Sequence, residues 1–142
     1  MQTRFTSLVK VKKNAMDRSE RELQQAHFNL NQAQEALQSA YKELENTTVP
    51  QSGTMAEMLF YRHLLTSVRQ NIEDKKAWLK FANEQLEASK KHFKAQSIEY
   101  EKYKYLETQE INELLKKMKL KEAKALDEVA LMGYMNRRNQ LI

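Results

Sequence analysis

Histidines are the residues of this sequence most suited to metal binding or acid–base chemistry, and there are three: His27, His63 and His92. None of them lies four residues from another, which is the spacing that places two metal ligands on one face of a helix. His63 falls one position from a heptad stripe described below, so it belongs to a solvated or half-buried helix surface. We therefore expect no metal site.

Carboxylates are plentiful, but their spacing does not favour catalysis. Two pairs lie two residues apart, and residues two apart point to different faces of a helix; these pairs are Glu20/Glu22 and Glu99/Glu101. The sequence has no cysteine and only two isolated glycines, so it offers neither a thiolate nucleophile nor a phosphate-binding loop. We expect a protein that is not an enzyme and has no cofactor.

The whole chain has a net charge of +5 and an isoelectric point near 9.3. Its excess of basic residues lies mostly in the last quarter. Lysines between Lys116 and Lys124 carry the excess and could neutralise phosphates. They are spread around the helix and diluted by acidic neighbours, so nucleic-acid binding is a less favoured alternative. The same spread argues against a membrane-surface helix.

Exposed apolar residues point to protein docking instead. A dense run follows the chain's most turn-rich segment and would point all round a helix; it comprises Met55, Met58, Leu59, Phe60 and Tyr61. Apolar and methionine-rich surface of this kind is typical of partner contacts. The alternative is that the preceding loop folds over these side chains. Trp78 and Phe81 form a weaker second candidate.

A heptad series runs without interruption through the middle of the chain, from Met58 to Tyr100 at every seventh residue. An earlier series matches it, with members Val9, Met16, Leu23, Leu30, Leu37 and Leu44. The companion positions of the earlier series include Ala26, Ala33 and Ala40, so large residues alternate with small ones along the seam, which permits close packing of two helices. With Gly 2 and Pro 1 in 142 residues, few turns are possible.

The segment 46–53, with Pro50 and Gly53, is the expected break, and Gly53 is free to adopt a positive φ there. Thr54 and Glu57 have the spacing of a capping box. The sequence thus predicts an all-α fold in one domain. It is a long antiparallel two-helix coiled-coil hairpin with helix one over about 5–45 and helix two over about 54–132.

The pairing register is left open by the heptads. One arrangement sets Ala40 opposite Leu65, and a slide of one heptad is the alternative. In either arrangement we expect Phe5 opposite roughly the region 93–100. After Tyr100 the apolar positions change phase and continue to Met132 without a partner in helix one. This single-helix extension needs another protein or a second copy of the chain. Gly133 is the expected stop, with 133–142 as a frayed tail.

Two stretches together resemble the flagellar FliJ family. The opening Phe5-Thr-Ser-Leu-Val-Lys-Val-Lys12 leads into a long helix, and the stretch 121–128 is similar to the family's E-x-K-x-x-D-E ending. The likeness covers nearly the full length, although the tip residues match no family motif. Related stalks of virulence-type secretion systems share this architecture.

The resemblance implies a stalk and escort component of the type III protein export apparatus at the flagellar base. FliJ-like proteins insert into a hexameric export ATPase, contact the export-gate membrane protein FlhA and escort export chaperones. On this basis the expected ring contacts are Lys121, Glu122, Lys124, Asp127 and Glu128. Gate or chaperone contacts would involve Met55, Leu59, Phe60 and Tyr61.

The resemblance also implies a cytoplasmic protein, peripheral to the inner membrane. The sequence is consistent with this, since it has no apolar run near the ~20 residues that span a bilayer and no signal-peptide core. The alternative function is a homodimerising structural coiled coil.

Overall fold

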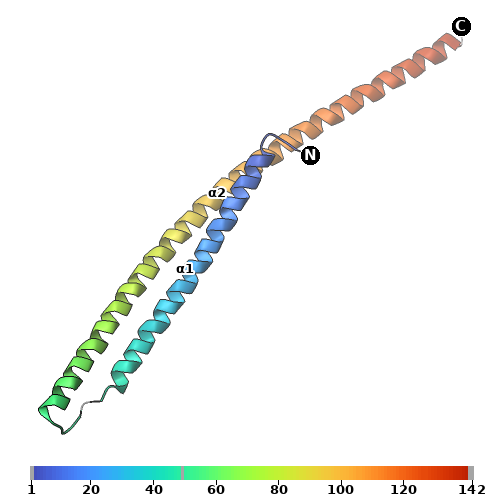
Figure 1. The fold of residues 1–142 in the computed structure, drawn as a ribbon. Helices are drawn as coiled ribbons and strands as arrows, with labels where there is room; N and C mark the ends of the chain where they lie inside the picture. Colours follow the sequence, from blue (N-terminus) through green and yellow to red (C-terminus); the bar gives the residue numbers. More distant parts are fainter. Residues whose placement is uncertain (1, 49, 141–142) are drawn as a thin grey trace. The chain divides into compact units, whose positions relative to one another are not determined.

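The computed structural model describes residues 2–48 and 50–140, and it is all-helical, with two long helices packed against each other as a hairpin (Figure 1). Helix α1 spans Thr6–Asn46 and helix α2 spans Met55–Gln140. Contacts divide the chain into two units. One comprises residues 15–97, and the other combines residues up to 14 with those from 98 onward. This confirms the predicted fold class, whereas the prediction of a single domain stays a prediction.

Within residues 15–97, α1 and α2 lie side by side along a seam that follows the predicted heptads (Figure 1). Its most buried members on α1 are small, and these are Ser19, Ala26, Ala33 and Ala40. Those on α2 are larger for the most part, and these are Val68, Ile72, Ala82 and Leu86. Small residues on one helix allow the backbone of the other to approach, so the larger side chains fill the space between them.

The register is the one-heptad slide. Tyr41 of α1 lies beside Lys76 of α2, and a shallow hollow is lined jointly by Tyr41, Leu44 and Ile72. If Ala40 lay opposite Leu65, Tyr41 would be about 18 Å along the helix from Lys76, at ~1.5 Å per residue. The arrangement with Ala40 opposite Leu65 is therefore wrong.

The charge of Lys76 is affected by its neighbours on both helices. The carboxylate of Glu73, 3.4 Å from the ammonium, is the main cause that raises the pKa of Lys76 above 10.5, and Tyr41 adds to it. A raised pKa means that the folded chain holds this proton more tightly. The interaction of the Lys76 ammonium with Glu73 therefore contributes fully to stability below pH 10.5, and this contribution is lost as the pH rises through the raised pKa.

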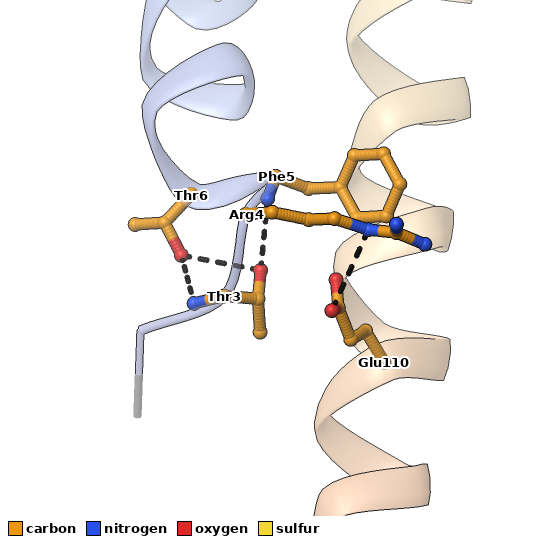
Figure 2. Close-up of polar contacts among 5 residues, drawn as sticks. All are labelled: Thr3, Arg4, Phe5, Thr6 and Glu110. Carbon is orange, nitrogen blue, oxygen red and sulfur yellow. Dashed lines mark hydrogen bonds and ion pairs between the residues drawn. The ribbon is translucent and has the colours of Figure 1, made fainter.

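The start of α1 is fixed by two threonines, as Figure 2 shows. The backbone N–H of Thr3 donates to Thr6 Oγ1 at 2.9 Å, and the N–H of Phe5 donates to Thr3 Oγ1 at 3.2 Å. These bonds satisfy donors that have no partner inside the helix. The observed start of α1 at Thr6 agrees with the predicted start near residue 5.

The start of α2 is capped by Thr54, whose Oγ1 accepts a hydrogen bond from the N–H of Glu57 at 3.2 Å. The Glu57 carboxylate folds back toward Gly53, where a Cβ atom would collide with it. No glycine among the described residues has a positive φ, so Gly53 does not use its freedom to adopt one. Gly53 serves here by leaving space for the Glu57 side chain.

The end of α2 differs from its prediction. The helix continues through Gly133 to Gln140, and nothing lies within 4 Å of the position where a Cβ atom of Gly133 would be. The predicted stop and the frayed tail from 133 are therefore wrong as far as residue 140; residues 141 and 142 lie outside the described part. One glycine costs a helix only about 1 kcal/mol, and good helix formers on both sides of it offset this cost.

Candidate functional site

The first candidate surface, here called the tip surface, consists of Met55, Leu59, Phe60 and Tyr61 at the start of α2. The exposed fractions of Met55, Leu59 and Phe60 are 78%, 48% and 71%. Successive helical residues point about 100° apart, so a one-sided seam cannot cover all four. Tyr61 alone lies at a seam position, three residues after Met58 of the heptad series, and it alone is half-buried. The structure thus places the predicted tip residues together and leaves three of them exposed.

The loop before α2 does not cover this surface. A shallow hollow is lined by loop residues Thr48 and Pro50 and by Phe60, Tyr61 and Leu64 of α2. The loop thus borders one side of Phe60, yet most of that ring remains exposed. The interpretation in which the loop folds over these side chains is therefore wrong for the described part of the loop. An apolar hollow beside exposed aromatic and methionine side chains suits a protein partner.

The second candidate surface lies on α2 after its contact with α1 ends. All residues from Asn112 to Gln140 are exposed except the half-buried Leu114. The five predicted ring-contact residues are all in this segment, and all are exposed: Lys121, Glu122, Lys124, Asp127 and Glu128. At about 100° per residue they spread around the helix, with Glu122 and Asp127 about 140° apart. The structure brings them onto one free segment, but not onto one face.

The face of α2 that meets the first residues of α1 keeps the earlier heptad phase. Half-buried positions continue from Tyr103 through Glu107 and Glu110 to Leu114. Ile111 is also half-buried, while 41% of Leu115 is exposed. The half-buried positions therefore do not follow the predicted change of phase after Tyr100 as far as Leu114, and all residues from 115 to 140 are exposed.

Ion pairs join α1 to this part of α2, and the heptad pattern did not predict them. Arg4 Nε lies 3.6 Å from Glu110 Oε1, as Figure 2 shows, while Lys12 Nζ lies 3.7 Å from Glu99 Oε2. The Lys12 ammonium is also 5.4 Å from the ring centre of Tyr103. The predicted position of Phe5 opposite residues 93–100 is wrong, because its neighbour Arg4 reaches Glu110. With the register known, the opposite charges at facing positions of α1 and α2 would have predicted these ion pairs from the sequence.

Other chemistry-bearing residues are dispersed. His27, His63 and His92 are exposed, and no cluster of possible metal ligands occurs within residues 2–48 and 50–140. Trp78 and Phe81 of α2 are 39% and 58% exposed, and the Lys75 ammonium lies 5.5 Å from the Trp78 ring centre. Neither helix, over its described length, has an apolar stretch able to cross a bilayer.

The fold and these surfaces define a class of protein: a two-helix coiled-coil hairpin with large apolar side chains exposed at its tip and along the last part of α2. The chain matches the family described as "Flagellar FliJ protein" over residues 1–139, and it belongs to that family. No curated protein matches it. No solved structure matches it either.

Family membership makes the chain a component of the flagellar export apparatus. The FliJ family is a structural export component that is not known as an enzyme, and its partners belong to the same apparatus.

Proposed function

We propose that this chain is the stalk and escort component of the flagellar export apparatus. In this proposal the free segment of α2 enters the hexameric export ATPase, and the tip surface contacts the export-gate membrane protein FlhA or export chaperones. The protein works in the cytoplasm, peripheral to the inner membrane. The flagellar assignment rests on the family match rather than on architecture, which virulence-type stalks share.

The observation that carries the proposal is the exposure of residues 112–140. Large apolar side chains remain uncovered along this segment, among them Leu126 at 70%, Val129 at 66% and Met132 at 65%. An isolated amphipathic helix gains little stability in water, because most helix stability in proteins comes from packing an apolar face. A segment of this kind is expected to be covered by a partner.

A stalk of this type needs no chemistry of its own. Its surface differs from one side to the other: Glu122 lies among apolar residues, while Lys121 and Lys124 lie to one side. A ligand that binds one conformation of a subunit better than another shifts that subunit's equilibrium. An asymmetric helix inside a ring would therefore favour nucleotide binding at some interfaces over others, which is a coupling between sites.

The test is the ATPase rate of the cognate export ATPase with and without the purified chain. We expect the full chain to raise the rate or the hexamer fraction, and a truncation after Leu114 to abolish this effect while keeping the seam intact. A matched control is the double substitution Leu59→Gln/Phe60→Gln at the tip surface. It should retain ATPase stimulation and lose gate or chaperone binding. Equal stimulation by the truncated chain would contradict the proposal.

The alternative is a structural coiled coil that homodimerises through the same segment, which its exposed apolar residues also favour. Sedimentation equilibrium separates the two. A dimeric mass in dilute solution, lost on truncation after Leu114 and accompanied by no ATPase effect, would favour the dimer.

A further inference from the structure

One short part of α2 is apolar on every side. Residues 129–135, Val-Ala-Leu-Met-Gly-Tyr-Met, carry no charged group, and α2 is continuous through them. At about 100° per residue, seven successive positions cover the whole circumference of the helix. The large ones are all exposed: Val129 66%, Leu131 59%, Met132 65%, Tyr134 65% and Met135 56%. We call residues 129–135 the apolar collar.

The collar differs from the paired part of the same helix. Between residues 68 and 86 the buried positions recur at helical spacing, as at Val68, Ile72, Ala82 and Leu86, and most of the exposed residues between them are polar or charged, with Trp78 and Phe81 as the large apolar exceptions. That pattern suits one neighbouring helix, whereas a helix that is apolar all round suits burial on all sides. Val129 and Leu131 lie about 160° apart around the axis, so a single partner helix, including a second copy of this chain, would leave one of them exposed.

The charged residues before and after the collar indicate the charge and the shape of the partner's binding site. Residues 116–124 carry five lysines and one carboxylate, Glu122, whereas Asp127 and Glu128 lie between these lysines and the collar; the lysines are Lys116, Lys117, Lys119, Lys121 and Lys124. A partner surface facing this segment is favoured if it carries carboxylates. Beyond the collar come Arg137 and Arg138, and burying two arginines in a closed apolar pocket would be costly. The partner site is therefore open at its far end.

A lipid surface fits these observations less well. Seven apolar residues are far fewer than the ~20 that span a bilayer, and a helix lying flat on a membrane would place only one side of the collar in lipid. Asp127 and Glu128 directly precede the collar, and anionic lipids would repel them.

We propose that the apolar collar sits inside an open-ended apolar sleeve of a partner protein, with carboxylates around the mouth of the sleeve facing the lysines of residues 116–124. The inference rests on the proposed function, in which the partner is the export ATPase ring. It moves the main contact from residues 121–128 to residues 129–135. It also requires contact on opposite sides of the helix.

The experiment measures the Kd of the full chain for the purified cognate export ATPase, using variants on opposite sides of α2. Val129→Gln and Leu131→Gln should each weaken binding roughly tenfold or more, because each removes apolar burial. Leu120→Gln is the matched control: Leu120 is also exposed, at 64%, but lies away from the apolar stripe of its segment. It should change Kd less than about twofold, and circular dichroism should show equal helix content in all variants, since glutamine is a good helix former.

The outcomes are distinguishable. A loss with Val129→Gln alone would mean one-sided docking and would overturn the sleeve. Wild-type binding by both collar variants, with binding lost on truncation after Leu114, would overturn the collar but leave the proposed function standing. Undiminished binding by the truncated chain would overturn both.

Two further measurements test the alternatives. A dimeric mass that the collar variants convert to monomer would overturn the sleeve in favour of a second copy of the chain. Binding to vesicles of anionic phospholipid that the collar variants abolish would overturn it in favour of lipid. Lys117→Glu/Lys121→Glu should weaken ATPase binding and flatten its salt dependence; unchanged binding would remove the acidic mouth from the proposal.

Discussion

Residues 15–97 and residues 112–140 carry apolar positions at similar helical spacing, yet they differ in burial. In the first region α1 supplies a partner, so Ala33 is 0% exposed and Leu86 only 5%. In the second, leucines and methionines of the same kind are mostly exposed, Leu126 at 70%. A heptad pattern therefore indicates which side chains of a helix favour burial, but not whether another part of the same chain buries them. Stability should therefore depend on the first region and binding on the second.

The largest expected effect contrasts Leu86→Ala with Val129→Ala. Truncating Leu86 removes buried apolar atoms from the seam and should lower the free energy of unfolding by about 2 kcal/mol or more. Truncating Val129, which is 66% exposed, should change it by less than about 0.5 kcal/mol. Chemical denaturation followed by circular dichroism measures both. Comparable losses from the two would show that residues 112–140 are covered in the free protein.

A second contrast replaces alanine by a larger residue. Ala33→Leu should cost about 1–3 kcal/mol, because the facing backbone leaves no room for the added atoms. Ala125→Leu adds the same atoms at an exposed position of α2 and should be nearly neutral in the free chain. The two unfolding midpoints give the comparison. A neutral Ala33→Leu would mean that the helices separate easily at this point.

A third change acts in the opposite direction. Gly133→Ala should stabilise the last turns of α2 locally by roughly 0.5–1 kcal/mol, since alanine has the higher helix propensity and space is open there. Hydrogen exchange of the amides around residue 133 measures the effect. Faster exchange in the variant would contradict a continuous helix at this position.

The smallest effect is expected at the ion pair near the start of α1. Arg4→Ala removes a pair whose arginine side chain is 78% exposed, so the loss should be about 0.5 kcal/mol or less and should shrink with added salt. Denaturation at low and high salt measures it. A loss that persists at high salt would indicate that Arg4 acts through packing on Phe5, whose ring centre lies 5.0 Å from the guanidinium carbon.

Much of the fold was predictable because its signals are local. Leucine and alanine at heptad spacing, together with Pro50 in the loop, were enough to predict two helices and the hairpin. The helix end was not predictable from Gly133, because that glycine is one unfavourable residue within a favourable stretch. The apolar character of residues 129–135 is visible in the sequence, but its meaning depended on the helix continuing through them. Which residues touch the partners stays a prediction.

The sequence by itself determined which side chains of each helix favour burial, since that depends only on the period of the apolar residues. Tertiary structure decided the register, because a shift of seven residues leaves every heptad in phase and only contacts such as Tyr41 with Lys76 distinguish the two arrangements. It also decided where cover ends on α2, after Leu114, because α1 has no further residues to supply it.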